Sequence, residues 1–149
     1  MEQPDYTPIE ILLVEDNEDD VILTTLAFKR GKVSNNIHVA MDGVEALAFL
    51  RREGKYAAAP RPDIILLDLN LPRMNGHELL EKIKTDPLFK AIPVIILTTS
   101  KAEDDIVKTY EHHSNCFISK PVVMEDFDKV IMTLEDFWFQ IVRLPHTEK

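Results

Sequence analysis

Three short apolar runs recur along the chain, and each of them ends at a polar side chain. The runs are residues 11–14, 64–67 and 94–97, and the residues that end them are Glu15 with Asp16, Asp68 and Thr98. Runs of this length, separated by helical patterns, are typical of strands buried on both faces of a parallel sheet. The spacing therefore favours an α/β fold in which helices cover both faces of the sheet.

The whole chain divides into five strand–helix units of this kind. We expect strands at about residues 10–14, 37–39, 64–67, 94–97 and 116–119, and helices at about residues 18–30, 77–84, 102–113 and 124–142, with one more helix after Asp42. Asp42 followed by Glu45 is a capping-box pattern, as is Ser100 followed by Glu103. Five such units predict a doubly wound, five-stranded parallel sheet with a buried centre and two edge strands.

Length, charge and hydropathy limit the classes of protein that remain. A chain of 149 residues fits one domain, which we expect at residues 9–143 between tails at residues 1–8 and 144–149. The net charge of −9 disfavours nucleic acid as a partner, because phosphate backbones repel it. No apolar run approaches the ~20 residues of a membrane span, and the N-terminus lacks a signal-peptide pattern. We therefore expect a cytoplasmic protein.

The polar residues at the strand ends are expected to meet, because the carboxyl ends of parallel strands share one edge of a sheet. The residues that this edge gathers are Glu15, Asp16, Asp68, Thr98 and Lys120. Neighbouring carboxylates repel one another unless a cation lies between them, and oxygen ligands with open positions suit Mg²⁺. A hydroxyl and an ammonium group at the same edge can bind the oxygens of a phosphoryl group. The pattern predicts a site for Mg²⁺ and a phosphoryl group.

Each of these residues also has an ordinary structural interpretation. Acidic residues favour the N-terminus of a helix, but Glu15 and Asp16 precede the helix and end a buried strand. Asp68 could cap a helix or lie in a loop, Thr98 could be only a strand former, and Lys120 could be only a solvated charge. Their convergence at one edge is what favours the functional interpretation.

With these residues in place, the chain resembles the receiver domain of two-component response regulators, which has the flavodoxin-like fold of the chemotaxis regulators. The resemblance covers about residues 9–134. It rests on Glu15-Asp16, Asp68, Pro72, Gly76, Thr98 and Lys120-Pro121, in that order on five strand–helix units. It implies the strand order 2-1-3-4-5 and a Mg²⁺-dependent transfer of a phosphoryl group to Asp68 from a phosphohistidine of a sensor histidine kinase.

The resemblance also implies a role for each matching residue at the site. Asp68 is then the phosphoacceptor, and Thr98 and Lys120 bind the phosphoryl oxygens. The implied metal ligands are Glu15, Asp16, Asp68 and the backbone carbonyl of Asn70.

Further from the site, the resemblance implies a switch in which Phe117 moves toward Thr98 after phosphorylation. Pro121 is a candidate for a cis peptide bond that would aim the preceding lysine. Two residues depart from the common pattern of the family. Glu15 stands where many relatives have aspartate, and Phe117 stands where tyrosine is common, so that the switch would gain packing without a hydroxyl hydrogen bond.

A narrower resemblance concerns the second half of the chain, which is similar to the single-domain regulators of cyanobacterial and bacterial phytochromes. It rests on Leu97-Thr98-Thr99-Ser100, Glu103-Asp104-Asp105, Asn115-Cys116 and Phe137-Trp138-Phe139 through Leu144-Pro145. It implies a phytochrome-type sensor kinase as the donor. The last helix carries more large apolar side chains than one sealing stripe needs, so we expect a homodimer with candidate contacts at Trp138, Phe139 and Val142.

Two other functions compete with a phosphorylated switch. A phosphohydrolase of small phosphate esters needs a general acid, and Asn70 stands where an Asp-x-Asp spacing from Asp68 would place one. A pseudo-receiver that only binds partners is expected to lack a site residue, and the matching residues are all present. The pattern therefore favours a phosphoacceptor switch, which is not an enzyme in the ordinary sense.

Overall fold

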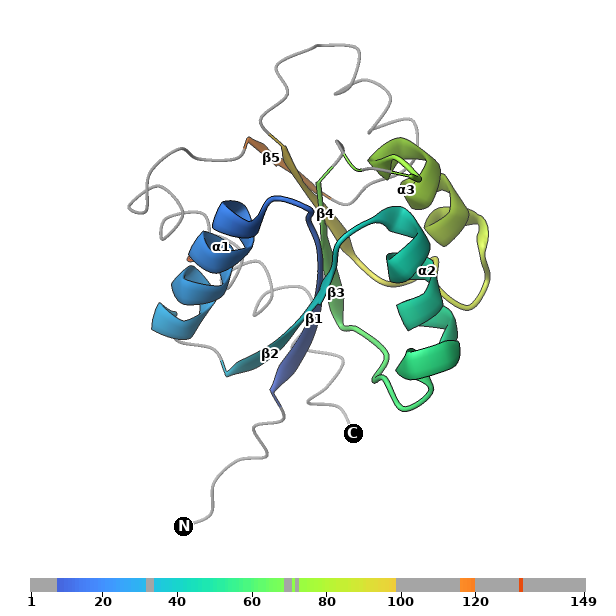
Figure 1. Cartoon of the computed structure of the whole chain (residues 1–149), viewed down its shortest axis with the longest axis horizontal. Helices are drawn as coiled ribbons and strands as arrows, with labels where there is room; N and C mark the ends of the chain where they lie inside the picture. Colours follow the sequence, from blue (N-terminus) through green and yellow to red (C-terminus); the bar gives the residue numbers. More distant parts are fainter. Residues whose placement is uncertain are drawn as a thin grey trace.

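The computed structural model describes residues 8–31, 34–68, 71, 73–98, 116–119 and 132 of the chain. A parallel sheet forms its centre, with the strand order β2-β1-β3-β4-β5 (Figure 1). The strands are β1 (Ile9–Val14), β2 (Asn35–Ala40), β3 (Ile64–Leu67), β4 (Val94–Thr98) and β5 (Cys116–Ser119). The order β2-β1-β3-β4 confirms the predicted doubly wound arrangement, and the backbone of β5 pairs with β4 beyond it.

The central strands β1 and β3 are the most apolar because both of their faces are covered. All four side chains of β3 are buried, and so are the last four of β1. β2 forms an edge of the sheet and is only partly buried, in agreement with its mixed sequence. It is longer than the predicted residues 37–39, because every residue from Asn35 to Ala40 pairs in register with β1. The alternating pattern had identified only its centre.

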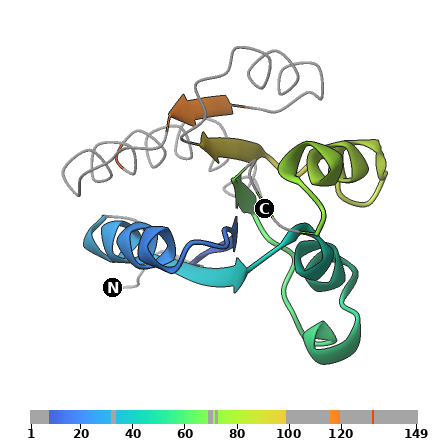
Figure 2. The ribbon, with the colours of Figure 1, turned by 45° about the horizontal axis from the view of Figure 1, so that its top comes forward.

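Helices cover both faces of the sheet, as Figure 2 shows. They are α1 (Glu18–Arg30), α2 (Gly43–Arg51) and α3 (Gly76–Thr85), with a short 3-10 turn η1 (Gly54–Tyr56) after α2. Along β1, Ile11 and Leu13 belong to one apolar cluster, to which α1 contributes Phe28. Leu12 and Val14 belong to the other, which includes the buried residues of α2 and α3. The alternation of side chains along a strand therefore supplies a core on each side of the sheet.

Asparagine and aspartate side chains begin the three helices. The Oδ1 atoms of Asn17, Asp42 and Asn75 accept hydrogen bonds from the N–H groups of Asp20, Glu45 and Glu78, at 3.0, 2.8 and 2.9 Å. The cap at Asp42 confirms its prediction. In the described part of the chain, the Glu45 carboxylate does not make the return bond of the predicted capping box, and its Oε1 atom accepts a hydrogen bond from the Tyr56 hydroxyl at 2.9 Å.

Several predicted elements lie outside the described residues. They are residues 1–7 of the predicted tail at 1–8, the tail at residues 144–149 and the helix at about residues 102–113 with its cap at Ser100. The helix at about residues 124–142 also lies outside them, apart from the helical residue Met132. Within the described part of the chain, none of the helices is both long enough and apolar enough to cross a membrane.

Candidate functional site

β1 and β3 are neighbours in the sheet, and an acidic residue directly follows each of them. Val14 pairs in register with Leu67, so Glu15 and Asp68 leave the carboxyl edge of the sheet side by side. The N–H of Asp68 donates to the carbonyl of Val14, and the N–H of Glu15 donates to the carbonyl of Ala40, each at 3.0 Å. The sheet therefore fixes the backbones from which both carboxylates project.

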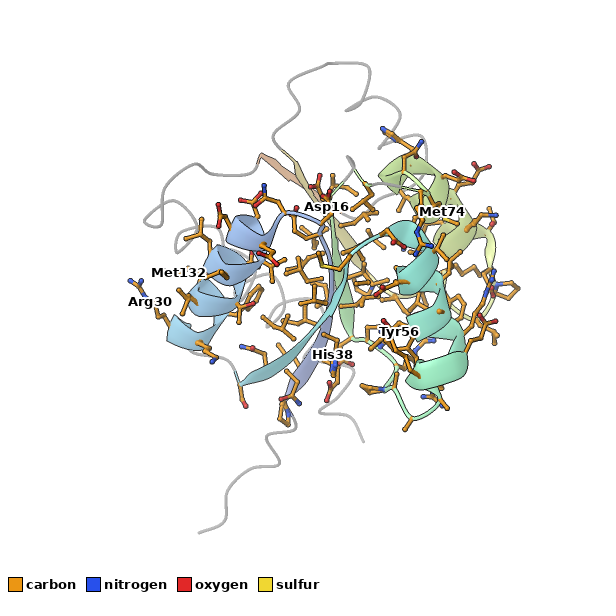
Figure 3. The ribbon with its side chains drawn as sticks, viewed as in Figure 1. Asp16, Arg30, His38, Tyr56, Met74 and Met132 are labelled. Atoms are coloured by element: carbon orange, nitrogen blue, oxygen red, sulfur yellow. The ribbon has the colours of Figure 1, made fainter. Side chains whose placement is uncertain are left out.

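Asp16, which is labelled in Figure 3, completes an acid cluster at this edge. One carboxylate oxygen from each of Glu15, Asp16 and Asp68 lies within 4.8 Å of the other two. Glu15 is only 2% exposed and Asp68 only 7%, whereas Asp16 is exposed to solvent. The predicted convergence of the three acids is confirmed, and the acid cluster has a buried side and an open side.

This donor set fits a hard divalent cation. Three like charges at such a separation repel one another, and burial of carboxylates without a counter-charge costs several kcal/mol. Oxygen-only ligands suit Mg²⁺ or Mn²⁺ better than metals that prefer nitrogen or sulfur. The exposed side, at Asp16, leaves room for the water molecules that Mg²⁺ retains.

The turn from β1 into α1 is held by side-chain hydrogen bonds. The Oε2 atom of Glu15 accepts from the N–H of Asn17 at 3.1 Å, and the Asn17 side chain in turn caps α1. Glu18 and Asp19 of the first helical turn are exposed, which agrees with their ordinary interpretation as acids at a helix N-terminus. Glu15 has a different setting, because it is buried and is tied both to the strand and to the start of the helix.

The remaining predicted site residues are described only in part. Thr98 is the last residue of β4, at the same edge of the sheet, and it pairs in register with Ser119, which precedes Lys120. The side chains of Thr98 and Phe117 lie outside the described part of the structure. So do three whole residues that carry predicted roles, namely Asn70, Lys120 and Pro121.

One ion pair near this edge was missed by sequence reasoning. Arg73 donates from Nε at 2.9 Å and from Nη2 at 2.7 Å to the Oδ2 atom of Asp42. Burial raises the pKa of Asp42, but the N–H of Glu45 together with the hydrogen bond and charge of Arg73 outweighs burial, and the pKa lies below its ordinary value. The two residues are 31 positions apart, so no local spacing identifies the pair.

The sequences of known proteins match nearly all of the chain. Residues 11–132 match the family model described as the response regulator receiver domain. The response regulator Rcp1 of Synechocystis sp. is 44% identical over 138 residues, which are 93% of this chain and 94% of Rcp1.

Two solved structures extend the similarity to the fold. The phosphorylated cyanobacterial phytochrome response regulator RcpA has a TM-score of 0.84 and 45% identity, over 89% of this chain and 95% of that chain. The Mn²⁺-bound form of Rcp1 has a TM-score of 0.83 and 43% identity, over 91% of this chain and 97% of that chain. Because the family match, the strand order and the acid cluster agree, the chain belongs to the family of response regulator receiver domains.

Proposed function

We propose that the chain accepts a phosphoryl group on Asp68 from the phosphohistidine of a phytochrome-type sensor histidine kinase and thereby switches partner binding. The observation that carries this proposal is the acid cluster, in which the buried Asp68 carboxylate lies beside Glu15 and Asp16. A lone carboxylate after a strand has many explanations. Three whose oxygens converge within 4.8 Å favour a site built for a cation and an anionic group.

In the proposed reaction, a carboxylate oxygen of Asp68 forms a bond to phosphorus while the phosphorus–nitrogen bond of the phosphohistidine breaks. The electron pair of that bond stays on the imidazole, which takes up a proton. The hydrogen bond from the Asp68 N–H to Val14 fixes the backbone from which the attacking carboxylate projects, and the side chain is buried. Thr98 and Lys120 are proposed to bind the phosphoryl oxygens, as donors that match the charge developing there.

Mg²⁺ is the proposed cofactor, with Glu15, Asp16, Asp68 and the backbone carbonyl of Asn70 as its ligands. When bound, it would neutralise the negative charge that accumulates as the phosphoryl group approaches the carboxylate. The Mn²⁺-bound form of Rcp1 supports a divalent ion in this family, because Mn²⁺ takes the same kind of oxygen ligands as Mg²⁺.

The pairing with a phytochrome-type kinase predicts a kinetic preference. A purified phytochrome kinase, labelled on its histidine, should transfer the label to this protein at least about tenfold faster than an unrelated sensor kinase, a difference of about 1.4 kcal/mol in activation free energy. The rate of transfer is measured as the loss of label from the kinase, with both proteins at equal concentrations. Equal rates from both kinases would contradict the pairing and leave the phosphoacceptor role intact.

The proposed response to phosphorylation is a switch in which Thr98 moves toward the phosphoryl group and Phe117 follows. Phe117 of β5 pairs in register with Ile96 of β4, two residues before Thr98. A movement of Thr98 therefore takes place close to Phe117. The unit that contains the switch is proposed to span residues 9–143, which the family match over residues 11–132 supports.

We also propose a homodimer through the last helix, with Trp138, Phe139 and Val142 as contacts. Met132, a helical residue of this region, is 53% exposed, as expected of an apolar side chain that a second subunit would cover. Sedimentation of the wild type at micromolar concentration should show a dimer, which Phe139→Glu should convert to a monomer, because a charge would enter an apolar contact. A wild type that stays monomeric at every attainable concentration, phosphorylated or not, would rule out the dimer.

A further inference from the structure

The carboxylate of Asp42 joins the start of α2 to the connection between β3 and α3, and it follows β2 at the edge of the sheet that carries the acid cluster. Its Oδ1 atom accepts from the N–H of Glu45 and caps α2, while its Oδ2 atom accepts both contacts from Arg73. The Asp42 side chain is 10% exposed and that of Arg73 is 57% exposed. The anion is therefore largely withdrawn from water, and the guanidinium approaches it from the connection between β3 and α3.

The backbone of Arg73 has a conformation that residues other than glycine rarely adopt. Its φ is +62°, in the left-handed region. A glycine would take this conformation without steric cost, yet an arginine stands here and both its Nε and Nη2 atoms contact Asp42. Such a backbone persists when surrounding contacts fix it, and the ion pair is a contact of that kind.

The neighbouring residues fix the same connection by packing. A Cβ atom on Gly43, the first residue of α2, would lie 2.7 Å from the carbonyl oxygen of Met74 and 2.8 Å from its Cβ. The backbone at position 43 and the backbone at Met74 approach this closely only because position 43 is glycine. Leu71 and Met74 both pack against the apolar cluster under α2 and α3, and Figure 3 shows Met74 beside these two helices.

These contacts hold Arg73 and Met74 at the α3 end of the connection, and the bond to Val14 holds Asp68 at its β3 end. We propose that the Asp42–Arg73 ion pair is a positioning device, which fixes Arg73 and Met74 against the N-terminus of α2, restrains Asp68 at the other end of the connection, and thereby sets the affinity of the acid cluster for its divalent cation. This inference rests on the metal site of the proposed function.

The test measures Mn²⁺ binding directly, by the electron paramagnetic resonance signal of the free ion in the full-length protein at neutral pH. Arg73→Ala should weaken Mn²⁺ binding about tenfold, the lower end of the effect of residues that orient metal ligands. Asp42→Asn keeps an oxygen for the cap of α2 but loses the charge, and it should weaken binding similarly. The double variant should be no weaker than either single variant, because both remove one interaction.

Two further variants separate the ion pair from the backbone conformation. Arg73→Gly adopts the left-handed conformation freely but lacks the guanidinium, so it should bind Mn²⁺ as weakly as Arg73→Ala. Arg73→Lys should recover part of the affinity, because an ammonium group offers a point contact in place of two directed donors. Full affinity in Arg73→Gly would overturn the role of the ion pair, since the backbone alone would then suffice.

Glu10→Gln is the matched control. It removes the charge of another partly exposed carboxylate, whose Oε1 atom lies 2.8 Å from the Nε2 atom of His38, nearer the opposite end of β1, and it should leave Mn²⁺ affinity unchanged. Asp16→Asn tests the metal site itself and should abolish binding. If Asp16→Asn abolishes binding while Arg73→Ala and Asp42→Asn bind as the wild type does, the positioning role fails and the site stands. If Asp16→Asn has no effect, the metal site fails.

Discussion

The Asp68→Asn variant should keep its unmodified mass after treatment with phosphoramidate and Mg²⁺, under conditions in which the wild type gains the mass of one phosphoryl group. The amide of asparagine has nearly the shape of the carboxylate but is a far weaker nucleophile, so the bond to phosphorus does not form. Because Asp68 is buried and faces two other acids, the loss of one charge should not unfold the protein. Intact mass spectrometry over a time course measures the result.

Asp63→Asn is the matched control, because it makes the same substitution just before the opposite end of β3. The Oδ2 atom of Asp63 accepts from the N–H of Glu10 at 2.9 Å, and asparagine retains an oxygen for that bond. This variant should be phosphorylated as fast as the wild type. Stoichiometric phosphorylation of Asp68→Asn would show that the acceptor lies elsewhere.

The strands of the sheet were predictable wherever burial on both faces leaves a continuous apolar run. The predicted bounds of β3 agree with the structure because Pro62 and Asp63 stop the run on one side and Asp68 stops it on the other. β2 was predicted too short because an edge strand is specified by its pairing with β1, which a local pattern does not contain. The helix caps at Asn17 and Asn75 have a local signal that was overlooked, namely asparagine directly before a helical run.

The site was predictable to the extent that topology determines it. Parallel strands place their carboxyl ends at one edge, and the register of Val14 with Leu67 then makes Glu15 and Asp68 neighbours. The family assignment agrees with the prediction of a signalling switch, since it places the chain among receiver domains rather than conventional enzymes. The contact between Asp42 and Arg73 was not predictable, because it depends on how α2 and the β3–α3 connection pack in space.

Mg²⁺ should stabilise the fold at neutral pH, because it relieves the repulsion among three carboxylates whose oxygens lie within 4.8 Å. At about 100 times its dissociation constant, the gain in the free energy of unfolding is about 2.7 kcal/mol. For a chain of this size that corresponds to a rise in Tm of about 5–10 °C. The gain should shrink as the pH falls, because protons compete with the cation for the carboxylates. Thermal unfolding followed by circular dichroism, with and without Mg²⁺, measures it.

Asp16→Asn and Asp19→Asn separate a specific site from general screening of an acidic protein. Both aspartates are exposed and close in sequence, and each substitution removes one negative charge, but only Asp16 belongs to the acid cluster. Asp16→Asn should lose most of the Mg²⁺-dependent rise in Tm, because one ligand is gone, while Asp19→Asn should keep it. Without Mg²⁺, Asp16→Asn should be at least as stable as the wild type, since it removes a repulsive charge. An equal loss of the Mg²⁺ response in both variants would mean that the cation acts by screening and not by binding between Glu15, Asp16 and Asp68.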